Sequence, residues 1–159
     1  MHGLHLIADL HGCRCATPLL CDAGALRALC LHEVAAAGLT AVNELFHTFP
    51  ARQPGEPAGV TGVVLLAESH LALHTWPELG VVTLDIHVCN RSDDSRPGAR
   101  HLLAALSRVF DPASLTSQEI ERHAGARTIN ADDAPDGVQP PRADPAPRAD
   151  NSPARQPIE

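Results

Sequence analysis

The chain has 159 residues, which is enough for one domain with a core of useful size. Its formal net charge of −7 argues against nucleic acid or an anionic membrane as the main partner, because both require a basic protein surface. All 12 basic residues are arginines, so the chain has no lysine that could hold pyridoxal phosphate as a Schiff base.

The cysteines and the apolar runs indicate the compartment of the protein and whether it spans a membrane. The 5 cysteines are an odd number without the spacing of a disulfide framework, and the N-terminus lacks a basic region followed by an apolar run. No apolar run approaches the ~18 residues of a membrane-spanning helix. We therefore expect a reduced, soluble, cytoplasmic protein. The sequence assigns no role to Cys13, Cys15, Cys21 and Cys30 beyond that of small buried side chains.

The first half of the chain reads as a strand, a helix and a second strand. Residues 4–10 alternate loosely between apolar and polar side chains, as a half-buried strand does. Asp22 is placed to cap a helix that Gly38 ends. Residues 39–49 are rich in apolar and branched side chains and predict a strand, and the Pro/Gly-rich residues 50–59 predict an exposed loop.

The second half continues the same sheet and adds a second helix. Residues 60–66 are nearly all apolar, which predicts a strand covered on both faces. Residues 71–75 and 81–88 predict further strands. A helix over 98–110 and a last strand over 115–121 would complete a second β–α–β passage.

The composition changes near residue 124. Beyond it Asp, Ala, Pro and Arg dominate and no apolar periodicity remains. Such a segment buries too little surface to offset an ordering entropy of ~1–2 kcal/mol per residue. We expect a functional domain over 1–123 and a disordered tail over 124–159.

Residues 67–78 gather most of the chemically useful side chains, and 85–89 add more. One reading is a metal site made by His70, His74 and Cys89. The branched and apolar neighbours favour a strand here, and residues four apart on a strand are ~13 Å apart, too far for one zinc ion. The sequence therefore predicts no metal.

Ser69 offers two other chemistries. A serine hydrolase is disfavoured, because Ser69 lacks the Gly-x-Ser-x-Gly elbow. Alternatively the Ser69 hydroxyl attacks the carbonyl of Glu68, and loss of the serine Cα proton then leaves dehydroalanine, which hydrolyses to a pyruvoyl group. That group forms a Schiff base with a substrate amine and supports decarboxylation. His74 is a candidate base and Cys89 a candidate proton donor, although for each of these residues taken alone a purely structural role is the better interpretation.

A longer pattern favours the second chemistry. Residues 59–78 contain Glu-Ser-His-Leu-x-x-His-Thr-Trp-Pro-Glu, and upstream lie His-Leu-Ile-Ala-Asp at 5–9 and Phe-His-Thr-Phe at 46–49. Together these segments closely resemble the prokaryotic S-adenosylmethionine decarboxylase proenzymes. The resemblance extends over about residues 3–123.

The resemblance implies a role for each matching residue. Cleavage between Glu68 and Ser69 would give a β chain, 1–68, and an α chain with its core over 69–123 and the pyruvoyl group at its start. His74 would transfer a proton in processing, Thr61 would assist it in place of the family's usual serine, and Cys89 would be the proton donor in decarboxylation.

The resemblance also implies a substrate, a fold and an assembly. Phe49 would stack on adenine and Glu78 would bind the ribose hydroxyls of S-adenosylmethionine. The family fold is a two-layer α/β sandwich of repeated β–α–β units, with an antiparallel or mixed sheet and helices on one face. Its protomers form dimers or larger oligomers through their sheets. Leu79 and Asn90 depart from the family pattern near the substrate.

These expectations define one principal function and two alternatives. The principal one is a self-processing, pyruvoyl-dependent S-adenosylmethionine decarboxylase that makes the aminopropyl donor for spermidine and other polyamines. The first alternative is the same machinery acting on arginine or ornithine. The second is an uncleaved homologue without enzymatic activity.

Overall fold

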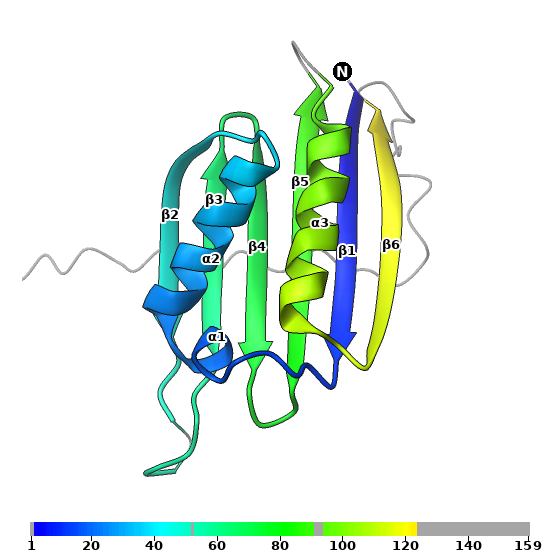
Figure 1. The fold of residues 1–159 in the computed structure, drawn as a ribbon. Coiled ribbons are helices and arrows are strands. Elements are labelled where there is room, and N and C mark those ends of the chain that lie inside the picture. Colours follow the sequence, from blue (N-terminus) through cyan, green and yellow to red (C-terminus); the bar gives the residue numbers. More distant parts are fainter. Residues whose placement is uncertain (1, 52, 91–93, 124–159) are drawn as a thin grey trace, which may run out of the picture. The chain divides into compact units, whose positions relative to one another are not determined.

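Within the described residues, 2–51, 53–90 and 94–123 of the computed structural model, a 6-stranded antiparallel sheet has the order β2-β3-β4-β5-β1-β6 (Figure 1). All these residues belong to the first of the chain's two units, Met1–Ala126. The strands are β1 (His2–His11), β2 (Ala41–Thr48), β3 (Val60–Leu66), β4 (Ser69–Trp76), β5 (Val81–Asn90) and β6 (Ser114–His123). The expected tail, 124–159, lies outside the described residues.

The helices α1 (Pro18–Cys21), α2 (Ala23–Ala36) and α3 (Arg96–Phe110) lie on one face of the sheet (Figure 1). Asp22 caps α2 as predicted, because its carboxylate accepts a hydrogen bond from the Ala25 N–H at 2.9 Å. Gly38 follows with a φ of 72°, a left-handed conformation that glycine adopts without strain. The short helix α1 was not predicted from the sequence.

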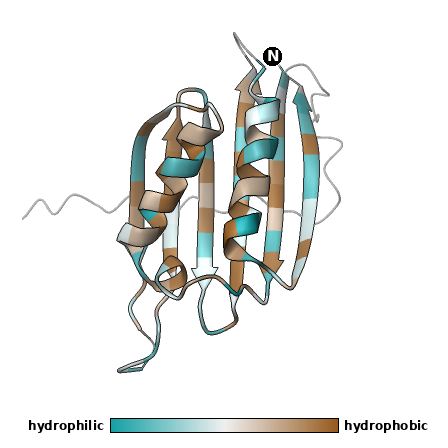
Figure 2. Cartoon of the chain, viewed as in Figure 1, coloured by the Kyte–Doolittle hydropathy of each residue, from teal (hydrophilic) through white to brown (hydrophobic). Residues whose placement is uncertain are grey.

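The expected two-layer class is confirmed, and the sheet is antiparallel rather than mixed. Hydropathy alternates along the strands, as a sheet covered on one face requires (Figure 2). The prediction that β3 is covered on both faces is wrong. Val60, Val64 and Leu66 are buried against the helices, whereas Leu65 on the other face is 46% exposed. We call this uncovered side of the sheet the open face.

The order of the strands puts different loops at opposite ends of the sheet. A tight turn at Ala67 and Glu68 joins β3 to β4 at one end. At the other end lie the loop 49–59, between β2 and β3, and the turn 77–80, between β4 and β5 (Figure 1). The predicted functional residues are divided between these two ends.

Candidate active site

Ser69 and Cys89 meet at the end of the sheet that holds the β3–β4 turn. Ser69 is the first residue of β4, and the Cys89 N–H of the neighbouring strand donates a hydrogen bond to its Oγ at 3.2 Å. Both residues are half-buried and line a pocket of about 290 Å³ together with Glu68. The structure therefore brings the predicted cleavage bond and the predicted proton donor together.

Cys89 also contacts a histidine to which the sequence reasoning gave no role. The Cys89 Sγ lies 3.8 Å from His87 Nε2 on the open face. His5 and His70 flank His87, each with its ring centroid 5.5 Å from the His87 ring. The signal in the sequence is period-two spacing, because Asp85, His87 and Cys89 alternate along β5 and so share one face.

Thr61 and His74 form a second pair. They are directly opposite each other in the register of β3 and β4, and His74 is exposed on the open face. Along β4, however, His74 is five residues from Ser69, a separation of ~17 Å in an extended strand. An odd spacing also puts the two side chains on opposite faces. Within one chain His74 does not reach Ser69.

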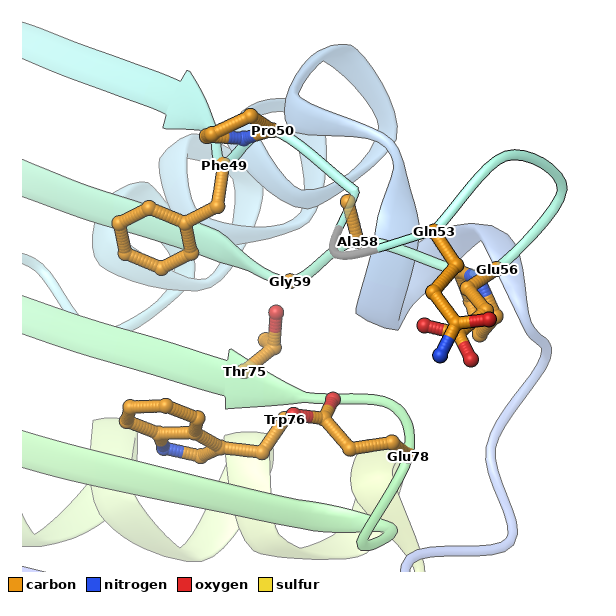
Figure 3. A pocket seen from close by; sticks show the side chains of 10 residues that line it. Phe49, Pro50, Gln53, Glu56, Ala58, Gly59, Thr75, Trp76 and Glu78 are labelled. Atoms are coloured by element: carbon orange, nitrogen blue, oxygen red, sulfur yellow. The ribbon is translucent and has the colours of Figure 1, made fainter.

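Phe49 and Glu78 line a larger pocket at the opposite end of the sheet, with a volume of about 630 Å³. Figure 3 shows the rings of Phe49 and Trp76 on one side of this pocket, the Gln53 and Glu56 side chains on the other, and the Glu78 side chain between them. The wall also contains Gly59, Thr75, Ala58 and two prolines. Sequence reasoning found Phe49 and Glu78 but missed Trp76, Gln53 and Glu56.

The floor of this pocket is held by a buried hydroxyl. Thr75 is 0% exposed, and its Oγ1 accepts a hydrogen bond from the Val60 N–H and donates one to the Leu20 carbonyl, both at 2.7 Å. Gly59 lets the loop approach β4 closely, because a side chain at this position would collide with the Thr75 carbonyl. Three segments of the chain therefore fix the pocket wall.

All five cysteines are free thiols. Burial raises the pKa of Cys13 to about 11 and that of Cys30 to about 12, and burial also raises the pKa values of Cys15 and Cys21.

Among the described residues, no group of three or more His, Cys, Asp or Glu side chains is arranged to hold a metal ion. No described helix is both long and apolar enough to span a membrane.

The described region of the chain also matches a known protein family. The family model described as S-adenosylmethionine decarboxylase matches residues 4–123. The chain belongs to the S-adenosylmethionine decarboxylase family. The family that its motifs predicted is thus confirmed, over nearly the whole of the described region.

Individual members of the S-adenosylmethionine decarboxylase family support the same assignment. The S-adenosylmethionine decarboxylase proenzyme of Picrophilus torridus is 34% identical over 120 residues, which are 76% of this chain and 83% of that protein. The proenzyme of a Hydrogenobaculum species is 37% identical over 116 residues, covering 69% of this chain and 80% of its own. The crystal structure of the adenosylmethionine decarboxylase from Aquifex aeolicus superimposes with a TM-score of 0.64 at 33% identity, covering 80% of this chain and 96% of that one.

Proposed function

We propose that this protein is a self-processing, pyruvoyl-dependent S-adenosylmethionine decarboxylase, a carboxy-lyase that supplies the aminopropyl donor for spermidine and other polyamines. The observation that carries the proposal is the hydrogen bond from the Cys89 N–H to Ser69 Oγ, at 3.2 Å, directly after the turn that holds Glu68. This contact supports the proposal, because it joins the backbone of Cys89 to the serine that the family motif marks for cleavage.

Self-processing follows from the position of Ser69. Its Oγ attacks the carbonyl carbon of Glu68, and the peptide bond becomes an ester. A base then removes the Ser69 Cα proton, Glu68 leaves as a carboxylate, and residue 69 becomes dehydroalanine. Water converts this to a pyruvoyl group and ammonia. The hydrogen bond from the Cys89 N–H orients Ser69 Oγ before the attack, and the same oxygen later leaves as part of the Glu68 carboxylate.

The pyruvoyl carbonyl supplies the electron sink for decarboxylation that pyridoxal phosphate supplies in other enzymes. The chain's own part is to exclude water and to deliver a proton. Residue 69 and Cys89 line the same pocket, and the resemblance to the family assigns to Cys89 the protonation of the carbon that loses carbon dioxide. No metal takes part in this proposal.

A complete site requires a second copy of the chain. Ser69 begins β4 and is bonded to Cys89 on β5, whereas His74 lies near the end of β4, and Phe49 and Glu78 line the pocket at that end of the sheet. The strand between them spans ~24 Å from its first residue to its last. A second copy related by a twofold axis across β4 would bring the two halves together.

The open face is suited to that contact. Its exposed apolar side chains include Leu45 (69% exposed), Leu65 (46%) and Ile120 (42%), on strands across the sheet. Apolar surface spread across one sheet face is typical of an interface. We therefore assign Thr61 and His74 to processing, and Phe49 and Glu78 to substrate binding, in the site whose Ser69 and Cys89 belong to the partner protomer. The minimal assembly is a dimer of αβ protomers.

The large pocket favours a nucleoside substrate. Phe49 and Trp76 offer aromatic surface for a base, and the Glu78 carboxylate is an acceptor for ribose hydroxyls. Arginine and ornithine have neither group. S-adenosylmethionine fits the pocket chemistry better than either of these amino acids.

Two measurements test the function. The intact mass of the purified protein should show two fragments split between Glu68 and Ser69, and Ser69→Ala should give one uncleaved chain. A single full-length species after long incubation would support the non-enzymatic alternative. The processed protein should release carbon dioxide from carboxyl-labelled S-adenosylmethionine, and release from labelled arginine or ornithine instead would overturn the substrate assignment.

The compartment is part of the proposal. Five free thiols are compatible with the reducing conditions of the cytoplasm, where both S-adenosylmethionine and polyamines are handled.

A further inference from the structure

The open face carries a cluster of titratable side chains that the proposed reaction has not used. His5, His70, His87 and Asp85 lie on three adjacent strands, β1, β4 and β5, in neighbouring cross-strand rows. Asp85 Oδ1 lies 2.8 Å from His5 Nε2 and 3.2 Å from His70 Nε2. The cluster therefore consists of two imidazoles joined by one carboxylate, with the third imidazole, His87, packed between them and Cys89.

His87 is the member of the cluster that touches the reaction site. Its Nε2 lies 3.8 Å from Cys89 Sγ, within the distance at which a thiol makes a hydrogen bond. Gly3, opposite Cys89 on β1, leaves room for this contact. A β-carbon at residue 3 would lie 3.0 Å from the Val88 carbonyl and 3.5 Å from His87 Nε2. A side chain at residue 3 would therefore crowd the strand beside the imidazole and the thiol.

The surroundings of His87 favour its neutral form. Burial lowers the pKa of His87 below its ordinary value, and the positive charges of Arg122, His70 and His5 lower it further, while Asp85 opposes them. A neutral imidazole with an unprotonated Nε2 accepts the S–H of Cys89. The charged groups that face His87 from β1, β4, β5 and β6 therefore favour a neutral imidazole, which can accept a proton and release it again.

We propose that His87 is a positioning residue that orients the Cys89 thiol and returns a proton to it after each turnover. The proposal rests on the function proposed above, in which Cys89 protonates the product. Decarboxylation replaces a carboxylate with a hydrogen atom, so one solvent proton must reach Cys89 in each cycle. After the thiol has given up its proton, His87 Nε2 takes one from solvent and passes it to the Cys89 thiolate. The imidazole ends the cycle neutral, and no other bond changes.

The first test measures Cys89 itself, without decarboxylation. In the uncleaved Ser69→Ala protein, the rate of alkylation of Cys89 by iodoacetamide is followed by peptide mass spectrometry as a function of pH. Adding His87→Phe should slow alkylation of Cys89 at neutral pH about tenfold, because the thiol loses the base that accepts its proton. The buried Cys30 serves as an internal control for folding, since its alkylation should stay slow in both proteins.

The second test uses a matched pair of variants in the processed enzyme. His87→Ala leaves a cavity that added imidazole can enter, whereas His87→Phe fills the same space. Both should lower kcat about 100-fold, with the KM for S-adenosylmethionine nearly unchanged. Imidazole should restore kcat in His87→Ala but not in His87→Phe, which a purely structural role of His87 would not produce.

The outcomes separate the two proposals. Equal Cys89 alkylation profiles with and without His87, in proteins whose Cys30 remains protected, would overturn the role of His87. So would a loss of kcat that imidazole fails to restore in His87→Ala. If the wild-type chain neither cleaves nor releases carbon dioxide, the proposed function fails, while the alkylation profile still reports whether His87 acts on Cys89.

Discussion

The proposed division of the site between two protomers can be tested by co-expressing two variants of the chain. Ser69 and His74 lie on one strand, five residues apart, so they are ~17 Å apart and face opposite sides of the sheet. A base acts at hydrogen-bonding distance, about 3 Å from the proton that it removes. No rotamer change of His74 closes that gap, and the proposed function therefore pairs each Ser69 with the His74 of the other copy.

The perturbation is co-expression of two inactive chains with different affinity tags. One chain carries Ser69→Ala and the other carries His74→Ala, and mixed dimers are isolated through both tags. In a mixed dimer one site combines the intact Ser69 of one chain with the intact His74 of the other, while the second site has neither. The His74→Ala chain should therefore be cleaved in the mixed dimer although it stays whole on its own, so that about half of all chains are cleaved.

A matched control reverses the prediction. Wild-type chain co-expressed with the Ser69→Ala, His74→Ala double variant gives mixed dimers in which the wild-type Ser69 faces an alanine. That wild-type chain should stay uncleaved at Glu68. Intact mass measurement reads both experiments. Cleavage of the wild-type chain in the control, together with an uncleaved His74→Ala chain in the first mixture, would show that Ser69 and His74 act within one chain and would refute the reasoning.

Three further predictions concern single positions. Thr75→Val leaves the Val60 N–H and the Leu20 carbonyl without their buried partner, at about 1–3 kcal/mol each, so urea unfolding should show a loss of about 3 kcal/mol, against about 1 kcal/mol for Thr75→Ser. Burial, the main cause, holds the pKa of His87 in the folded protein below its ordinary value of 6.5. As the pH falls, the imidazole is therefore protonated in the unfolded chain before it is protonated in the folded chain, and the free energy of unfolding should decrease below pH 6.5. His87→Phe should lose less stability than wild type over that pH range, and an equal loss would contradict the shift. Glu78→Gln should raise the KM for S-adenosylmethionine about tenfold with a smaller change in kcat, and an unchanged KM would remove Glu78 from the substrate site.

Local patterns predicted most of the fold. Alternation and apolar runs predicted the strands to within two residues at each end, and the carboxylate of Asp22 predicted the start of α2. The error at β3 has a physical cause. A run of seven residues that are nearly all apolar is typical of a strand covered on both faces. Within one chain, however, only one face of β3 is covered. In the proposed dimer, the second copy covers the other face.

The site was predicted less completely than the fold. The motif identified Glu68, Ser69 and Cys89, which the structure places together. It also made His74, five residues after Ser69, the candidate base for processing. Five residues of strand is, however, a long distance in space. The period-two spacing of His87 and Cys89 was present in the sequence, but the ring contacts of His87 with His5 and His70 come from other strands, and single-sequence patterns do not contain strand order.

The short spacing of the motif in the sequence and the proposed division of the site between two copies both follow from the geometry of β4. β4 carries Ser69 at its start and His74 and Trp76 near its end, so one stretch of sequence contributes to both halves of the site. A twofold axis perpendicular to β4 near Leu71 and Ala72 exchanges the ends of the strand, and therefore places the start of one copy against the end of the other. Every dimer then contains two identical sites, each with one Ser69 and one His74. The spacing between these residues is thus set by the geometry of the proposed interface rather than by a contact within one chain.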